Sequence, residues 1–301
     1  MSHRVLGIDA GGSHSLALLA DASGQVLGEA RSSRANLQLE GEAEVERVLG
    51  SLVAELGGTD GIGAVCLGCA GVDRPRDLER VRGILDRLGL RQGVVIVNDA
   101  EIALVAGTPD GIGIVVVSGT GALAWGRDAG GAIARAGGYG FLLSDEGSAY
   151  WIGQQALRAA VRAEDARGPE TSLAPLIYAE LQATSIAELL PRLYEARVPR
   201  DRIAAIAPAV QRAADAGDAV AREIVEAAGR ELALAARTVA GRLSLGSGEW
   251  PLVLAGGAFK ACSSLESALV AALDLPSASV RRLQNEPALG AVRLACGQLP
   301  A

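Results

Sequence analysis

The sequence has few aromatic residues and a single lysine. Aromatic side chains make up 3% of its 301 residues, so the core must be built from Ala, Val, Leu and Ile. Apolar residues nevertheless reach 50%, which lies in the globular range and argues against wholesale disorder. Lys260 is the only lysine, and acids and arginines are interspersed at a net charge of -7. The absence of a basic stripe argues against nucleic acid as the main partner.

Long apolar runs and clustered metal ligands are also missing. No run is long enough to cross a membrane and the first residues do not resemble a signal peptide, so we expect a cytoplasmic protein without a membrane partner. Cys66 and Cys69 have the spacing of a metal or redox motif, but Cys262 and Cys296 are far apart and both histidines lie near the N-terminus. We therefore expect the cysteines to pack as small core residues.

One block of sequence is present twice, over residues 5–26 and 114–133. Each copy has an apolar run, a glycine turn with hydroxyl side chains, a second short run and an Asp-x-x-Gly turn. Short runs on either side of a glycine turn are typical of hairpins. Two such hairpins at equivalent places in the two halves predict a duplicated domain that binds a phosphate chain from both sides.

The rest of the chain alternates between strand-like and helix-like segments, which indicates an α/β fold. Short β-branched runs are typical of buried parallel strands, and we expect these at 62–68, 94–97, 112–117 and 251–255. Periodic apolar residues predict helices in the first half over 42–55 and 76–88. The second half is mainly helical, with helices expected over 148–164, 172–183, 185–194, 200–216 and 218–242.

The first glycine turn follows a buried strand. Gly11 and Gly12 would let backbone N–H groups approach phosphate oxygens, and Ser13 and Ser15 can add hydroxyl donors. Asp9, at the end of the strand, can hold Mg2+ directly or through water. One such turn alone is more often an ordinary hairpin, so the prediction depends on the second copy.

The second copy places Ser118, Gly119 and Thr120 at the equivalent turn. A later glycine pair, Gly256 and Gly257, follows a strand and precedes Ala258, where a nucleotide can lie against the backbone. Its alternative role is a plain strand-to-helix turn. Neither a P-loop nor a dinucleotide fingerprint is present.

Two further segments have acids in positions suited to chemistry. Asp99 follows the strand at 94–97, where a carboxylate can act as general base toward a hydroxyl or can cap the next helix. Residues 137–151 combine glycines, aromatics and the adjacent acids Asp145 and Glu146 before a helix. This segment suggests a sugar or polyol site, and its alternative is a capped helix entry with core aromatics.

These segments, in this order, resemble the superfamily of actin, Hsp70 and sugar kinases. Within it the chain is similar to the N-acetylglucosamine kinase group, which shares a family with the ATPase activators of benzoyl-CoA reductase and 2-hydroxyacyl-CoA dehydratase. The most specific match is the Gly-Tyr-Gly at 138–140 followed by residues 144–151, and the resemblance covers essentially the whole chain.

The resemblance implies roles for single residues. Asp99 matches the catalytic base, and the positions that match sugar contacts are Asn36, Asp99, Thr120, Gly138, Tyr139, Asp145 and Ala149. Tyr139 stands where the animal enzyme has tryptophan, which leaves N-acetylglucosamine and glucosamine both open as substrates. ATP and Mg2+ are the implied cofactors.

The resemblance also implies the architecture. We expect two ribonuclease H-like, actin-like ATPase domains with a cleft between them, over 1–111 and 112–286, the second with a helical insertion. The closing segment 287–301 is expected to return to the first domain. We expect a homodimer that phosphorylates a small amino sugar at its 6-hydroxyl. The alternatives are an ATPase activator of a radical dehydratase, which needs a cluster cysteine, and a nucleotide-binding sensor without turnover.

Overall fold

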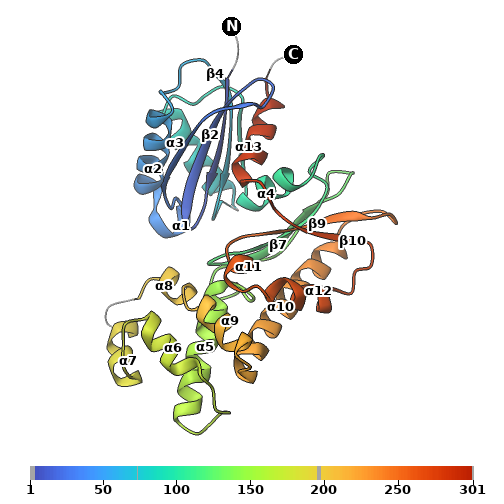
Figure 1. Cartoon of the computed structure of the whole chain (residues 1–301). Coiled ribbons are helices and arrows are strands. Elements are labelled where there is room, and N and C mark those ends of the chain that lie inside the picture. The colour runs from blue at the N-terminus through green and yellow to red at the C-terminus, as the bar shows by residue number, and fades with distance from the viewer. Residues whose placement is uncertain (1–3, 73, 195–197, 300–301) are drawn as a thin grey trace. The chain divides into compact units, whose positions relative to one another are not determined.

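The computed structural model describes residues 4–72, 74–194 and 198–299. The chain divides into two compact units, one of Met1–Gly113 with Leu283–Ala301 and one of Ile114–Arg282. Each unit contains a five-stranded sheet, and the strand orders β3-β2-β1-β4-β5 and β8-β7-β6-β9-β10 follow the same plan (Figure 1). The expectation of a duplicated α/β architecture is therefore confirmed.

The first unit is built around β1 (Arg4–Ala10), the central strand of its sheet. β1 pairs antiparallel with β2 (His14–Asp21) and parallel with β4 (Ile62–Cys69). The outer strands are β3 (Val26–Ser33), antiparallel to β2, and β5 (Val94–Val97), parallel to β4. Because β1, β4 and β5 are parallel, their carboxyl ends meet at one edge of the sheet, where ligands bind in open α/β sheets.

Helices cover both faces of this sheet. α2 (Glu42–Glu55) and α3 (Pro75–Arg87) pack on one face, after the short helix α1 (Leu37–Glu40). α4 (Asp99–Gly107) and α13 (Pro287–Cys296) pack on the other. A sheet covered on both faces needs strands that are apolar throughout, which explains the continuous runs in the sequence.

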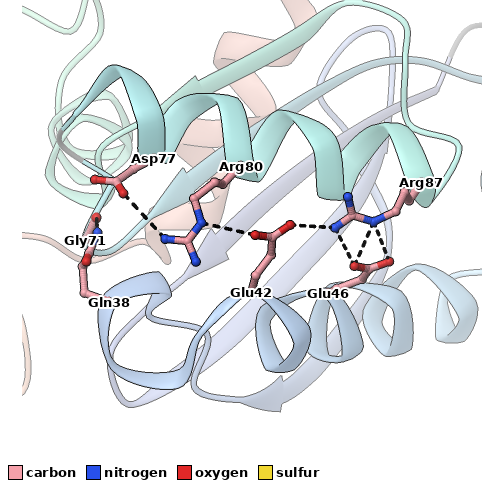
Figure 2. A network of polar contacts seen from close by, with 7 residues as sticks. All are labelled: Gln38, Glu42, Glu46, Gly71, Asp77, Arg80 and Arg87. Carbon is pink, nitrogen blue, oxygen red and sulfur yellow. Dashed lines mark hydrogen bonds and ion pairs between the residues drawn. The ribbon is translucent and has the colours of Figure 1, made fainter.

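Arginines and acids join α2 to α3 along their exposed sides. Arg87 lies 3.0 Å from Glu42 and 2.7 Å from Glu46, and Arg80 lies 3.2 Å from Glu42; Figure 2 shows these contacts as dashed lines. Each pair is partly exposed and contributes little by itself. Together the pairs link two helices whose apolar faces already meet the sheet.

The second unit repeats the sheet and adds a helical insertion. Its strands are β6 (Gly113–Ser118), β7 (Ala122–Arg127), β8 (Ile133–Gly137), β9 (Trp250–Ala255) and β10 (Ala278–Arg282). The insertion between β8 and β9 comprises α5 (Ala149–Glu164), α6 (Leu173–Glu180), α7 (Ile186–Tyr194), α8 (Arg200–Ala204), α9 (Ala207–Asp215) and α10 (Ala219–Ala240). Two short helices, α11 (Ala258–Ala261) and α12 (Leu265–Leu273), lie between β9 and β10.

The single helix predicted over 200–216 is wrong. The segment forms α8 and α9, separated at Ala205 and Ile206. A proline lies in the first turn of α9, a position that tolerates its missing N–H and its fixed φ. Periodicity continues through the break, which is why the pattern predicted one helix.

The repeated Asp-x-x-Gly turns have the same geometry in both units. Asp21 Oδ1 accepts from the N–H groups of Ser23 and Gln25, at 2.9 and 3.0 Å. Asp128 Oδ1 accepts from the N–H groups of Gly130 and Ala132, at 3.0 and 2.9 Å. The turn glycines have φ of 86° and 83°, a region that other residues rarely adopt.

α13 lies against β1 and α4 at very short range. A Cβ added to Gly290 would lie 1.9 Å from the carbonyl oxygen of Ile102 in α4, and one added to Gly7 would lie 2.4 Å from the Val292 nitrogen. Arg293 then donates to the Val105 carbonyl at 2.7 Å, at the end of α4 where carbonyls lack helical partners. Figure 1 shows this red helix beside the blue strands, although the whole second unit separates them in sequence.

Among the described residues, no helix is both long and apolar enough to span a bilayer.

We predict that Gly290→Ala lowers the free energy of unfolding by about 1–3 kcal/mol or more, because the added methyl group meets backbone that cannot move aside. Urea unfolding followed by circular dichroism measures this. Gly297→Ala, at the C-cap of the same helix, is the control, since its Cβ would lie an ordinary 3.5 Å from the nearest carbonyl oxygen. Equal stability of the two variants would contradict the close packing of α13.

Candidate functional site

Three carboxylates gather at the sheet edge of the first unit. Asp9 lies near the end of β1, and Asp99 is the first residue of α4, directly after β5 and Asn98. Glu286 immediately precedes α13. The topology thus brings together acids that are far apart in the sequence, through two parallel strands and the returning helix.

The charges of these acids act on one another. Burial raises the pKa of the Asp9 carboxyl to about 8, and the negative charges of Asp99 and Glu286 add to that rise. Glu286 also forms an ion pair with Arg31 at 3.2 Å. A carboxylate that is crowded by two others is a site where a cation is favoured.

The turn after β5 contains a helix cap, Asn98, directly before Asp99. Asn98 is the N-cap of α4, and its side chain accepts from the Ala100 N–H at 2.9 Å. Asp99 Oδ1 lies 3.0 Å from the same nitrogen. Asn98 therefore fulfils the capping role at the start of α4.

The first glycine turn separates its two candidate hydroxyls. Gly11 closes the turn by donating its N–H to the His14 carbonyl at 3.1 Å, and Gly12 and Ser13 are exposed at its tip. Ser15 is fully buried opposite Ala10, on the sheet face that carries α2, and its hydroxyl has no hydrogen-bond partner. Asp9 lies on the other face of the sheet, so the Ser15 side chain does not share a face with Asp9.

Asn36, expected to contact sugar, caps a helix beside this turn. Its side chain accepts from the N–H groups of Gln38 and Leu39, at 3.0 and 3.2 Å. The neighbouring Ala35 donates its N–H to the Gly11 carbonyl at 3.1 Å. This bond ties the loop that carries Asn36 to the first glycine turn.

The second glycine turn is joined to the loop before α5. Gly119 donates its N–H to the Gly121 carbonyl at 2.9 Å and accepts from the Ala149 N–H at 2.9 Å. The buried Ser118 donates its hydroxyl to the Gly147 carbonyl at 2.8 Å, so this side chain has a structural bond of its own. Thr120 is partly exposed in the turn.

The late glycine pair lies beside that turn. Gly256 has a φ of 103°, and a Cβ there would lie 2.2 Å from the Ser118 carbonyl oxygen. Gly257 is exposed and caps the short helix α11, whose first residue is the buried Ala258. The second unit therefore places Gly256 against the turn that carries Ser118 and Gly119. Binding of a nucleotide at this backbone stays a prediction.

The glycine-rich loop after β8 has a bent backbone held by arginine. Gly137, Gly138 and Gly140 all have positive φ. Arg135 donates to the carbonyls of Gly137 and Gly138, at 3.1 and 2.5 Å, and its guanidinium lies 5.2 Å from the Tyr139 ring. Tyr139 is 67% exposed, so its ring is available to a ligand.

Asp145, near the end of this loop, is a buried acid whose carboxylate accepts two hydrogen bonds. Its Oδ1 accepts from the Ala122 N–H at 3.2 Å, and its Oδ2 accepts from Arg200 at 3.1 Å. Burial raises the pKa of Asp145, while the Ala122 N–H and the charge of Arg200 oppose that rise. The helix cap is Ser148, which accepts from the Trp151 N–H at 3.1 Å, so Asp145 is not the cap.

Arg200 and Glu286 were not predicted as site residues. Arg200 is 55 residues from Asp145, and no local motif distinguishes it from the other arginines. Glu286 immediately precedes α13, and only the return of α13 to β1 brings it near Asp9. Fold-level information was needed for both.

The two neighbouring cysteines point to opposite faces of the sheet. Cys66 packs with α13 and Cys69 with α2 and α3, and both are fully buried. Burial raises the pKa of the Cys66 thiol to about 12, which keeps it protonated. Within the described ranges, no three His, Cys, Asp or Glu side chains stand close enough to form a complete metal site.

Comparison with known proteins places this architecture. An N-acetylmuramic acid/N-acetylglucosamine kinase of Clostridium acetobutylicum is 35% identical over 298 residues, which are 97% of each chain. An N-acetyl-D-glucosamine kinase of Dictyostelium discoideum is 30% identical over 308 residues, covering 96% of this chain and 97% of its own.

A solved structure from Porphyromonas gingivalis, provisionally assigned as an N-acetylglucosamine kinase, has a TM-score of 0.77 at 21% identity and covers 98% of this chain and 99% of its own. That likeness confirms the expected fold class. The family model of the BadF/BadG/BcrA/BcrD ATPases matches residues 6–295, nearly the whole chain. The chain, whose motifs resemble those of this group, therefore belongs to the BadF/BadG/BcrA/BcrD ATPase family.

Proposed function

We propose that the protein is an ATP-dependent amino-sugar kinase that phosphorylates N-acetylglucosamine or a close relative at its 6-hydroxyl. The observation that carries the proposal is identity of 30% or more, along nearly the whole chain, to two curated kinases of this substrate class. The buried acid Asp145, in a glycine-rich loop with an exposed tyrosine, supports it because sugar hydroxyls need carboxylate acceptors.

In this proposal Asp99 is the general base. It takes the proton of the 6-hydroxyl as that oxygen attacks the γ-phosphorus of ATP, and the bond to the bridging oxygen of ADP breaks. Its position at the start of α4, directly after β5, places its carboxylate at the sheet edge close enough to Asp9 for the two charges to interact. Backbone N–H groups of the two glycine turns would offset negative charge on the phosphates.

The acids of the first unit fit a magnesium ion. Asp9, near the end of β1, would supply a carboxylate oxygen. Burial is the largest cause of its raised pKa, and the charges of Asp99 and Glu286, which a cation would offset, raise it further. Mg2+ is commonly held by one or two carboxylates, several waters and substrate phosphates, so an incomplete protein site is what such an ion uses. When bound, it would neutralise charge on the phosphate chain of ATP.

The alternative of a dehydratase activator has little support from the cysteines. Cys66 and Cys69 are buried on opposite faces of β4 and cannot bind one cluster together without rearranging the strand. The homodimeric state, the cytoplasmic location and the choice between N-acetylglucosamine and glucosamine stay predictions.

We expect ADP release to depend on sugar. A coupled ADP-release assay with N-acetylglucosamine, N-acetylmuramic acid, glucosamine and glucose should show slow basal turnover and clear stimulation by at least one amino sugar. Glucose is the control for the amino substituent. ADP release that no amino sugar stimulates, with a bound iron–sulfur cluster after anaerobic purification, would favour the activator instead.

Asp99→Asn should lower kcat at least about a hundredfold, because an amide cannot accept the proton of the attacking hydroxyl. ATP affinity should stay close to that of the unmodified protein. Glu55→Gln, which removes an exposed carboxylate from α2 of the same unit, is the matched control and should leave kcat unchanged. Near-normal turnover by Asp99→Asn would remove Asp99 as the base.

Gly12→Val and Gly119→Val should each weaken ATP binding. A Cβ at either position meets no protein atom within 4 Å, so the branched side chain obstructs only a ligand that approaches the backbone. Calorimetry with a non-hydrolysable ATP analogue measures the affinity. Gly248→Val, another position with open space, controls for the substitution itself. Unchanged affinity in both turn variants would show that these glycines do not hold the phosphates.

A further inference from the structure

Asp145 has an uncommon backbone and a carboxylate that is only partly used. Its φ is 72°, in the left-handed region that aspartate tolerates and most other residues avoid. A carboxylate can accept about four hydrogen bonds, and one oxygen already accepts from Ala122 and the other from Arg200. Each oxygen therefore retains accepting capacity for a ligand.

The guanidinium of Arg200, which donates to Asp145, also lies over two aromatic rings. Its guanidinium lies 4.8 Å from the Phe141 ring centre and 5.5 Å from that of Tyr150. The two rings meet edge to face at 5.5 Å. Cation–π contacts from two rings of this kind fix the plane and direction of the guanidinium.

Burying the Arg200–Asp145 ion pair costs free energy, which suggests that the pair has a role besides stability. The Arg200 side chain is 23% exposed, that of Asp145 only 5%, and the buried Arg200 Nε has no hydrogen-bond partner. A buried ion pair with an unsatisfied donor is frequently less stable than apolar packing of similar volume. Because this pair lies beside the loop that is proposed to bind sugar, its effect on the Asp145 carboxylate explains it better than a contribution to stability does.

The backbone that carries Arg200 is firmly anchored. Arg200 begins α8, and a Cβ added to Gly153 of α5 would lie 2.1 Å from the Ile203 carbonyl oxygen of α8. Asp145 lies three residues before Ser148, the N-cap of that same α5. Both partners of the ion pair are therefore positioned by one helix.

We propose that Arg200 is a positioning residue that fixes the Asp145 carboxylate as an acceptor for the hydroxyls of the amino sugar. The proposal rests on the proposed function, which supplies the sugar. It assigns part of the helical insertion, α8, to substrate binding.

The charges around Asp145 set the sign of a pH effect. Burial and Glu146 raise the pKa of the Asp145 carboxyl, while the Ala122 N–H, Arg200 and Arg135 lower it. Removing Arg200 takes away one lowering influence, so the carboxyl takes up a proton at higher pH. A protonated Asp145 has less accepting capacity, so sugar binding should weaken more as the pH falls.

Steady-state kinetics of Arg200→Met with N-acetylglucosamine tests this at pH 8 and pH 6. We expect the KM for sugar to rise about tenfold at pH 8 and further at pH 6, with the KM for ATP unchanged. Arg200→Lys keeps a charge and should restore part of the loss. Asp145→Asn tolerates the same backbone and should raise the KM for sugar without added pH dependence. Arg158→Met, at an exposed position of α5, is the control.

Carbon-13 NMR of aspartate carboxyls gives a readout that needs no turnover. The resonance absent from Asp145→Asn identifies Asp145, and its pKa should be higher in Arg200→Met than in the unmodified protein. An unchanged pKa would overturn the proposal whatever the substrate. So would an unchanged or lower KM for sugar, or equal rises in both KM values, which would indicate a merely structural role. Failure of every amino sugar with the unmodified protein would instead overturn the proposed function.

Discussion

The close contact of α13 with β1 and α4 is the constraint on which the first unit depends. Gly290 and Gly7 have no room for a side chain, so the helix can lie in only one place. That place brings Glu286 to the sheet edge where Asp9 and Asp99 already lie. The negative charge of Glu286 therefore acts on Asp9 because a helix from the C-terminal end of the chain packs on β1. A change that displaces α13 would also change the charge at this sheet edge.

The two units use one plan for different purposes. Their sheets have the same order, and their Asp-x-x-Gly turns match in hydrogen bonding. The acids of the first unit stand at strand and helix ends, where the proposed cation and proton transfer would be. The second unit adds helices, and with them a buried acid, Asp145, whose partner Arg200 comes from the insertion. Duplication supplied two similar frames, and the insertion made the second one different.

The sequence predicts the frame well and the site unevenly. Short β-branched runs and glycine turns give the strands, because a doubly covered sheet allows little else. The contact of Gly256 with Ser118 was not predicted, because it depends on the parallel pairing of β6 with β9. The burial of Ser15 could also have been foreseen, since it shares a face of β2 with the apolar and fully buried Ala17. Arg200 could not, because its partner is 55 residues away and depends on how α8 meets α5.

The position of α13 also affects folding during synthesis, because this helix is made last. The ribosome delivers β1 early, then the whole second unit, and only then the helix that packs on β1. Domains generally fold as units while the chain is made, so the second unit can finish first. Until α13 arrives, the apolar surfaces of Val5, Leu16 and Ile102 lack their cover. Nascent chains therefore pass through a stage in which one unit is complete and the other is exposed to chaperones and to aggregation.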